Sequence, residues 1–388
     1  MISRCVSRWC AGPRLLVLLT LLVISVVLVL QYTALFGNVA ARSDGGRLKF
    51  RCAQQDMSRP IYMLAWTPFF KSPMNDMLEG TAQCPEHNCV FTNNRSLLSE
   101  SQLIILHLPD AKVDDLPVRT RPDQATVFFV EESPQNMELY HVDLSKFPAA
   151  FFNWTMTYRR DSDCYRPYGG VQHVQHSVPD SHVLKYMEEM RTIAAKKHKV
   201  GVWMASNCWT KSRREQLIED LRQFIPIDIW GSCGTTEADA CPRSLAAECD
   251  KRIANEYKFY FAFENSNCAD YVSEKFWQKW ELPVVPIVLR RDTLSHLVPD
   301  SAFIAVDDFA DIAEMANRLR RLSTNVEEYI KYFAWKPHYQ AMSWTEQGFC
   351  CLCKRARECT HPASYVADIE DWWVRRGRCY DGYRFREK

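Results

Sequence analysis

A strand-to-helix segment between residues 258 and 281 carries side chains that could bind an anion. Its apolar run KFYFAFEN predicts a buried strand ending in Glu264 and Asn265. A helix is expected from 271 to 281, capped by Asp270, with three polar side chains on one face of its first turns, namely Tyr271, Glu274 and Lys275. Backbone N–H groups, the helix dipole and the lysine charge would favour a diphosphate there. An amphipathic surface helix with an exposed Glu–Lys pair is the alternative interpretation.

The elements around this segment alternate between strand and helix. Apolar runs predict further strands at KVGVWMAS, IDIWGSC and VVPIVL, and helices are expected over 211–224 and 308–322. The helix over 211–224 presents an apolar stripe to a sheet and carries Arg213 and Arg214 in its first turns. Such alternation favours parallel βαβ units, whose ligands bind at the carboxyl ends of strands near helix N-termini.

The N-terminal half also predicts buried strands, at IYMLAW, LIILHL and ATVFFVEES. A chain of 388 residues exceeds what one core usually supports, so about two packed units are expected. We therefore predict an α/β protein with two Rossmann-like domains facing a cleft, over 58–195 and 196–345. A cysteine-rich C-terminal tail follows over 346–388.

The N-terminus predicts a membrane anchor. Arg4, Arg8 and Arg14 precede an uncharged apolar stretch over 15–36, which is long enough to cross a hydrocarbon core of about 30 Å as one helix. The positive flank indicates a cytosolic tail over 1–14 and a single-pass type II topology, with a stem over 37–57. A cleaved signal peptide is the alternative, although the apolar core exceeds the usual length of about 7–15 residues.

Composition indicates an oxidising compartment and argues against a nucleic-acid partner. The 48 Lys and Arg residues against 47 Asp and Glu residues leave a net charge of +1, without the basic excess that phosphate neutralisation needs. All of the 16 cysteines except Cys5 and Cys10 follow the predicted anchor, an even number that permits full pairing. Cys350-x-x-Cys353 could be half of a zinc site, but it lacks a matching second half, so disulfides are favoured. Two sequons, at Asn94 and Asn153, would be glycosylated in such a compartment.

Several motifs together resemble the α-1,3-fucosyltransferase family. The segment FAFENSNCADYVSEKFW, followed by PVVPIVL, is similar to that family's donor-binding motif. The family's other signatures occur in the expected order, as FFVEESP at 128–134, TYRRDSDCYRPYG at 157–169, VWMASN at 202–207 and a late Cys-x-x-Cys. The resemblance extends from Ile61 to Cys353.

The resemblance implies a GT-B-type fold and an inverting transfer of L-fucose from GDP-β-L-fucose to the 3-hydroxyl of N-acetylglucosamine (GlcNAc). A single displacement needs a base for the acceptor hydroxyl and positive charge for the leaving GDP. The family's catalytic carboxylate matches Glu132, whereas the adjacent Glu131 should point to the opposite face of the strand. The donor-binding residues carry over to Arg214, Tyr271, Glu274 and Lys275. Arg213 could exchange roles with Arg214.

The remaining positions of the family pattern are less specific. Glu264 and Asn265 should line the same pocket or tie down the loop through backbone hydrogen bonds. Three residues of the middle motif are expected around the cleft, namely Tyr158, Arg159 and Tyr168. Asp161-Ser162-Asp163 resembles the metal-binding Asp-x-Asp of another glycosyltransferase class, but we interpret it as structural or cleft-lining. No metal or other cofactor is expected to be required, and stimulation by Mn²⁺ is left open.

The acceptor is left open by the sequence. Lewis-type vertebrate members carry His-His followed by Arg or Trp upstream of the catalytic strand, where this chain has His107-Leu108-Pro109. The cysteine-rich tail is more similar to invertebrate members, some of which modify the innermost GlcNAc of N-glycans. The expected protein is a Golgi membrane enzyme with a luminal catalytic body and an undetermined oligomeric state. The alternatives are a catalytically silent luminal glycan-binding protein and a protein O-fucosyltransferase that uses the same donor.

Overall fold

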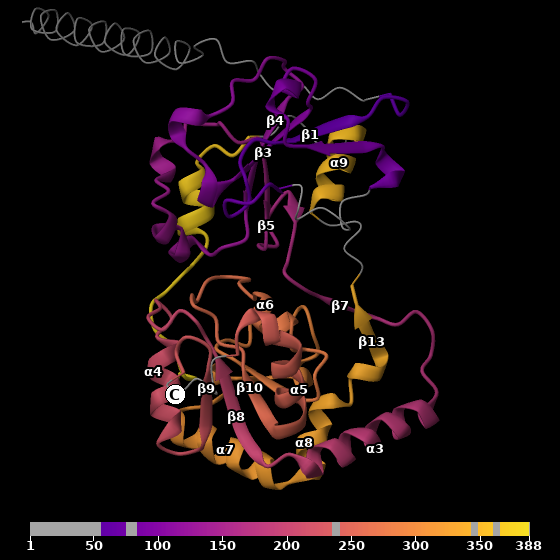
Figure 1. Ribbon diagram of the computed structural model, residues 1–388, viewed down its shortest axis with the longest axis vertical. Helices are drawn as coiled ribbons and strands as arrows, with labels where there is room; N and C mark the ends of the chain where they lie inside the picture. Colours follow the sequence, from indigo (N-terminus) through magenta and orange to yellow (C-terminus); the bar gives the residue numbers. More distant parts are fainter. Residues whose placement is uncertain (1–55, 75–83, 235–240, 343–347, 360–364, 388) are drawn as a thin grey trace, which may run out of the picture. The chain divides into compact units, whose positions relative to one another are not determined.

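The computed structural model describes residues 56–74, 84–234, 241–342, 348–359 and 365–387 (Figure 1). These residues belong to one compact unit that begins at Phe50. Within these ranges, no helix combines the length and the apolar character that a membrane crossing requires. The predicted cytosolic tail over 1–14 and the predicted anchor over 15–36 lie outside the described residues, as does all but the end of the predicted stem.

The first sheet is parallel throughout and has the strand order β2-β1-β3-β4-β5-β6. Its strands are β1 (Ile61–Ala65), β2 (Cys89–Thr92), β3 (Leu103–His107), β4 (Ala125–Val130), β5 (Trp154–Thr157) and β6 (Cys164–Tyr165). All residues of β4 are buried, as expected for a strand covered on both faces. Val127 and Phe129 face a core that includes helix α9 (Phe349–Glu358), whereas Phe128 and Val130 face a second core on the other side.

The second sheet is also parallel, with the order β12-β11-β10-β8-β9. Its strands are β8 (Lys199–Met204), β9 (Ile227–Trp230), β10 (Tyr257–Phe261), β11 (Val285–Val288) and β12 (Ile304–Ala305). From β8 the chain continues to β9 on one side of the sheet and then to β10, β11 and β12 on the other, so the strand order reverses between β8 and β10. Parallel sheets typically bind ligands at such a reversal, beyond the carboxyl ends of the strands. The two parallel sheets confirm the expected α/β class.

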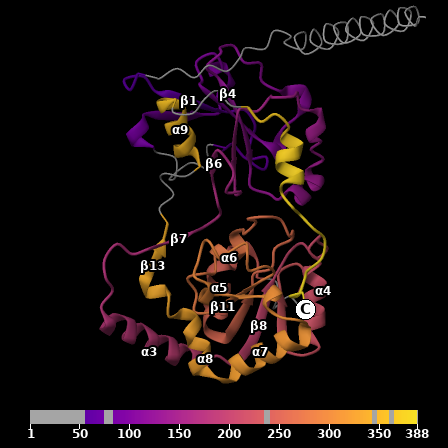
Figure 2. The same cartoon turned by 180° about the vertical axis from the view of Figure 1, so that it is seen from behind.

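Helices cover both faces of the second sheet (Figure 1; Figure 2). One core combines strand residues with α3 (Asp180–Lys196), α4 (Arg214–Arg222), α7 (Ile312–Thr324) and α8 (Val326–Ile330). The core on the other face includes α5 (Ala246–Glu256) and α6 (Glu274–Trp277). A short antiparallel pair joins β7 (Val171–His173) to β13 (Tyr339–Ala341).

Two predicted helices are shorter in the structure. The helix expected over 211–224 is α4, which begins only at Arg214. The helix expected over 271–281 is α6, which spans Glu274–Trp277 and is capped by Ser273 rather than Asp270. Asp270 has a left-handed backbone, with φ of 60°, and its carboxylate binds the Arg160 guanidinium at 3.0 Å. The prediction of one helical face for the 271–275 side chains was therefore wrong, because Tyr271 precedes the helix.

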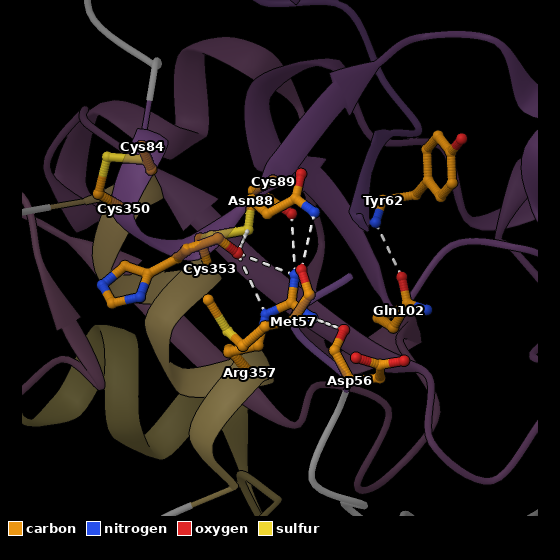
Figure 3. Close-up of a disulfide and its surroundings, with 11 residues drawn as sticks. Asp56, Met57, Tyr62, Cys84, Asn88, Cys89, Gln102, Cys350, Cys353 and Arg357 are labelled. Carbon is orange, nitrogen blue, oxygen red and sulfur yellow. Dashed lines mark hydrogen bonds between the residues drawn. A yellow bond between two sulfur atoms is a disulfide. The ribbon is translucent and has the colours of Figure 1, made fainter. Parts of the chain in front are cut away.

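The C-terminal cysteines attach α9 to the first sheet. Three disulfides connect them, Cys84–Cys350, Cys89–Cys353 and Cys164–Cys351. The Arg357 guanidinium on the same helix donates hydrogen bonds to the main-chain carbonyls of Asp56, His87 and Asn88 (Figure 3). The two cysteines of the Cys-x-x-Cys motif thus have different partners, which confirms disulfides in place of a zinc site.

Beyond α9, the chain reaches the second sheet. Trp372 and Trp373, in the π-helical turn η14 (Asp371–Arg375), pack on Phe128 of β4. The segment then forms the disulfide Cys268–Cys379 with the loop that follows β10. Two other disulfides lie near the second sheet, Cys208–Cys233 and Cys241–Cys249.

The two sequons have different environments. The Asn94 side chain is exposed and caps the short helix η2 (Arg95–Leu97). Asn153 is 3% exposed, and its amide oxygen accepts a hydrogen bond from the Thr126 N–H of β4 at 2.9 Å. A glycan on Asn153 would require this side chain to leave the core, whereas one on Asn94 would not, and both sites stay predictions.

Candidate active site

Strand β4 delivers two acidic residues to the carboxyl edge of the first sheet. The Glu132 carboxylate accepts a hydrogen bond from Asn136 Nδ2 at 2.7 Å and lies 3.4 Å from the Tyr271 hydroxyl. The Glu131 carboxylate instead binds the Arg166 guanidinium at 2.8 Å. The two neighbouring carboxylates diverge, as strand alternation predicts, and Glu132 is the one that meets the second sheet's loop.

The groups around Glu132 are neutral. Burial, together with the charge of Glu132, raises the pKa of Tyr140 to about 12. Burial is also the main cause that holds the pKa of three further phenols well above its ordinary value, those of Tyr158, Tyr168 and Tyr271. These phenols keep their protons at neutral pH. Within the described part of the chain no Lys, Arg or His forms an ion pair with Glu132.

A second carboxylate, Glu264, organises the loop that follows β10. It accepts hydrogen bonds from the Ser273 N–H at 2.8 Å and from the Ser273 hydroxyl at 2.8 Å, and it pairs with the Lys275 ammonium at 3.2 Å. The Lys275 ammonium also donates to the Ser273 hydroxyl at 2.8 Å and pairs with Glu274 at 3.1 Å. Three predicted donor-binding residues therefore form one polar cluster, Glu264, Glu274 and Lys275.

Opposite charges keep this cluster ionised. Burial opposes the charge on Lys275, but the carboxylates of Glu264 and Glu274 outweigh it and raise the pKa of Lys275. Burial likewise acts against the charge on Glu274, yet the neighbouring Lys275 lowers the pKa of its carboxyl. The side chain of Lys275 is largely buried, so its charge is only weakly screened by solvent. A fixed ammonium of this kind can stabilise a bound anion.

A buried hydrogen-bond network joins the two loops. Ser133 donates to the Ser266 hydroxyl at 2.7 Å, and Ser266 donates to Asn136 Oδ1 at 3.3 Å. Because Asn136 also donates to Glu132, the network runs from the acidic residue of the first sheet to the loop after β10. The sequence singled out none of these three residues, since their partners are 130 and 133 positions away and no local pattern marks them.

A narrow pocket of about 20 Å³ opens beside the loop after β10. We call it the β10 pocket; its walls include Glu264, Ser266, Tyr271, Arg290 and Thr293. Glu264 and Tyr271 were predicted to share a pocket, whereas Arg290 was not noticed. Arg290 follows β11, and a cation at the carboxyl end of the neighbouring parallel strand was the signal that could have found it.

Asn265 does not line the β10 pocket. Its main-chain carbonyl accepts a hydrogen bond from the Ser212 N–H at 3.2 Å, which ties the loop after β10 to the loop before α4. Its side-chain Oδ1 is buried and has no hydrogen-bond partner among the described residues. The main-chain contact corresponds to the loop-tying alternative of the sequence interpretation.

The two arginines that the sequence left open have different environments. Arg214 is 2% exposed and donates to the main-chain carbonyls of Phe263 at 2.7 Å and Asn207 at 2.9 Å, so it joins the ends of β8 and β10. Arg213 is exposed and lines a second pocket, of about 500 Å³, between the short helix η5 (Pro134–Tyr140) and the loop before α4. We call this second pocket the α4 pocket. Arg214 thus positions main chain, while Arg213 faces open space.

The middle motif packs around Tyr271. The ring centroids of Tyr158 and Tyr168 lie 4.9 Å and 6.4 Å from that of Tyr271. Gly169, which ends the motif, is required by a close approach, since a Cβ atom there would lie 2.0 Å from the ring of Trp277 in α6. The middle motif and the loop after β10 are therefore fitted to each other.

Arg159 and the acidic triplet have other partners. Arg159 is buried, donates to the Trp372 carbonyl and pairs with Asp161. Asp163 pairs with the Arg355 guanidinium of α9 at 2.7 Å. The two aspartates are thus held by different arginines, and within the described ranges no group of three or more His, Cys, Asp or Glu side chains could hold a metal ion.

His107, at the position where the sequence departs from Lewis-type members, is a core residue. Its side chain is fully buried, and Nδ1 lies 2.7 Å from the Asp110 carboxylate. Its ring packs against Phe69 and Phe129, with centroids 4.5 Å and 5.4 Å away. The side chain therefore supports the first sheet and does not face either pocket.

Comparisons with known proteins agree with this architecture. The profile for the C-terminal part of glycosyltransferase family 10 (fucosyltransferase) matches residues 194–372, and the fucosyltransferase N-terminal profile matches residues 58–169. The α-(1,3)-fucosyltransferase fut-5 of Caenorhabditis elegans is 34% identical over 323 residues, which cover 80% of this chain and 80% of the relative. The α-(1,3)-fucosyltransferase 7 of Homo sapiens is 30% identical over 81% of this chain and 86% of the relative. The glycoprotein 3-α-L-fucosyltransferase A of Drosophila melanogaster is 33% identical over 77% of this chain and 57% of the relative.

A solved structure shares the fold. The crystal structure of an α1,3-fucosyltransferase with GDP-fucose matches with a TM-score of 0.51 and 15% sequence identity, over 81% of this chain and 96% of that chain. The fold and site define an α/β protein with two parallel sheets whose carboxyl-end loops meet in one polar site. The chain belongs to glycosyltransferase family 10, the fucosyltransferases.

Proposed function

We propose that the protein transfers L-fucose from GDP-β-L-fucose, with inversion, to the 3-hydroxyl of a GlcNAc residue in a glycoprotein or glycolipid glycan. The contact of 3.4 Å between the Glu132 carboxylate and the Tyr271 hydroxyl carries this proposal, because it brings an acid of one sheet to the anion-binding loop of the other. A single displacement needs both at one reacting centre. Family membership and the α-(1,3)-fucosyltransferase names of the relatives support the same activity.

On the acceptor side, Glu132 removes the proton from the attacking hydroxyl. Its partners are an amide and a phenol, so the carboxylate can accept a proton without breaking an ion pair. A catalytically silent glycan-binding protein has no chemical need for an acid held in this way. This residue therefore favours the enzyme over the glycan-binding alternative.

On the donor side, Lys275 stabilises the charge that builds on the departing GDP. The polar cluster with Glu264 and Glu274 holds this ammonium in place. Arg290, in the wall of the β10 pocket, offers a second cation, which pairs with Asp292 in this structure. Arg214 joins the ends of β8 and β10.

The proposal includes a Golgi location with the catalytic body in the lumen. The apolar stretch over 15–36 behind three arginines supports a type II anchor. The disulfides support an oxidising lumen.

Incubation of the purified full-length protein with GDP-fucose and a panel of GlcNAc-containing glycans tests the proposal. We expect GDP release and a mass gain of one fucose on at least one glycan, with the new linkage at the 3-hydroxyl. Fucose on a peptide hydroxyl, and on none of the glycans, would identify a protein O-fucosyltransferase instead. Glycan binding without any GDP release would identify the silent glycan-binding protein.

A further inference from the structure

The α4 pocket has walls from both halves of the catalytic body. One wall is η5, which follows Glu132, and the other is the loop between β8 and α4. Two large apolar side chains in these walls are unusually open to solvent, Trp209 at 87% and Leu139 at 63% exposed. A tryptophan this exposed contributes little to a core, which points to a ligand as its partner.

The position of this pocket relative to Glu132 indicates its role. Asn136 lines the α4 pocket and donates to the Glu132 carboxylate, whereas Tyr271 lines the β10 pocket and contacts the same carboxylate. The two pockets share none of their wall residues. Glu132 itself is not a wall residue of either pocket, but it contacts one wall residue of each, so a ligand in the α4 pocket would lie near the proposed base.

The charges of the α4 pocket suit a neutral ligand. The wall has two cations, Lys211 and Arg213, and two carboxylates, Glu138 and Glu215. Lys211 pairs with Glu138 at 3.4 Å. Sugar rings are uncharged and present an apolar C–H face together with hydroxyls, so an open aromatic face with a polar rim matches them. The volume of about 500 Å³ is in the range of small-ligand sites.

We propose that the α4 pocket binds the part of the acceptor glycan that extends beyond the fucosylated GlcNAc, with Trp209 as the stacking surface. This assignment rests on the proposed fucosyltransferase function. It makes Trp209 a determinant of which glycans are accepted.

The substitution Trp209→Ala in the full-length protein tests this assignment. With an oligosaccharide acceptor we expect the KM for that acceptor to rise roughly 5- to 20-fold, the effect of losing one aromatic contact. The KM for GDP-fucose and the rate with a single-GlcNAc glycoside should stay at the wild-type values, since neither uses the pocket. Trp209→Phe should recover most of the loss, and Leu184→Ala, an exposed leucine of α3 that is 70% exposed, serves as the surface control.

The other outcomes contradict either this assignment or the proposed enzyme, and they can be told apart. A rise in the KM of Trp209→Ala for GDP-fucose would show that the α4 pocket binds the donor. Equal losses of activity with long and short acceptors would show that the pocket does not bind the extended part of the acceptor. Calorimetric titration of the acceptor oligosaccharide into the GDP-bound protein gives an independent readout. If the wild type turns over no acceptor yet binds the oligosaccharide at least fivefold more tightly than Trp209→Ala, the subsite stands and the proposed enzyme fails. Equal binding by both proteins would show that Trp209 is an ordinary surface residue.

Discussion

The two sheets each deliver a carboxylate from the end of a buried parallel strand, and the two carboxylates are held in opposite ways. Glu132, after β4, has an amide at 2.7 Å and a phenol at 3.4 Å as its partners. Glu264, after β10, is paired with the Lys275 ammonium and with both donors of Ser273. Among the described residues, the same residue type in equivalent places of two parallel sheets therefore has no ion-pair partner in one sheet and a lysine partner in the other.

The different partners of Glu132 and Glu264 indicate different roles for the two carboxylates, one in proton transfer and one in positioning the loop. A carboxylate without a cation can take up a proton during a reaction at little cost to the fold, because no ion pair is lost. A buried carboxylate that is paired with a lysine must stay ionised, since protonating it would leave the lysine without compensation. We therefore assign proton transfer to Glu132 and the shape of the donor loop to Glu264.

The largest effect is expected from Glu132→Gln. The amide keeps the shape and the contact distances but cannot accept the hydroxyl proton, so kcat should fall roughly 10²- to 10⁴-fold while GDP-fucose affinity is retained. Initial rates and calorimetric titration with GDP-fucose check the two parts. Glu131→Gln is the matched control, because Glu131 pairs with Arg166 and points elsewhere. Near wild-type turnover of Glu132→Gln would move the base to another residue.

A smaller effect is expected from Lys275→Ala. The loss of the ammonium should weaken GDP-fucose binding about 10- to 100-fold, the cost of one or two strong charge contacts. It should also lower the midpoint of thermal unfolding, because Glu264 loses its partner in a largely buried place. The double variant Glu264→Gln, Lys275→Met separates these effects, since it should recover the midpoint but not the donor affinity. Donor affinity that survives both changes would reduce Lys275 to a structural residue.

Removing the Cys268–Cys379 disulfide should have a moderate effect on the KM for GDP-fucose. The C-terminal segment holds the loop after β10 through this disulfide and through main-chain hydrogen bonds, from Ala269 N–H to Gly377 at 2.8 Å and from Tyr380 N–H to Asn267 at 3.0 Å. In the variant Cys268→Ser, Cys379→Ser, we expect the KM for GDP-fucose to rise a few-fold with a smaller change in kcat. The matched control removes Cys241–Cys249, which closes a short loop before α5. An unchanged donor KM would show that the hydrogen bonds alone fix the loop.

The smallest expected effect concerns Lys197, a buried lysine whose environment differs from that of Lys275. Lys275, beside two carboxylates, has a raised pKa, whereas burial and the neighbouring Lys258 and Lys336 lower the pKa of Lys197 to about 6. The partners of the Lys197 ammonium are the main-chain carbonyls of Tyr257, at 2.7 Å, and Pro283. The same side chain thus shifts in opposite directions, because a carbonyl dipole does not compensate a full charge.

This shift predicts a pH dependence of stability. Between the folded pKa of about 6 and the ordinary value of 10.5, the unfolded chain binds the extra proton, so the contribution of Lys197 to stability increases as the pH rises through this window. Below pH 6 its unfavourable charge is fully present. Lys197→Met should therefore raise the midpoint of thermal unfolding by a few °C at pH 6 and by less at pH 9. A midpoint difference that does not change with pH would contradict the assignment.

The sequence predicted the parts that depend on local order. The buried runs IYMLAW, LIILHL, ATVFFVEES and KVGVWMAS became strands that end one to three residues before the expected limits, because continuous apolar stretches of this length bury well in parallel sheets. The helix over 271–281 failed for a tertiary reason: Tyr271 and Val272 are buried against other elements, and Glu264 fixes the Ser273 N–H that begins the short helix α6. Likewise, the sequon triplet at Asn153 is a local pattern and does not reveal that the side chain is buried.

The amino-acid sequence by itself determined the residue types available for chemistry, the alternation that produces parallel sheets, and the acid and cation motifs that identify the family. Only the tertiary structure decided which acid has a cation as its partner, which arginine faces a pocket and which cysteines pair. The physical reason is distance along the chain. Local patterns fix what a segment of ten or twenty residues can become, whereas the Glu132–Tyr271 contact, the serine network and the disulfides of α9 join residues more than a hundred positions apart. Those contacts exist only once both sheets have packed.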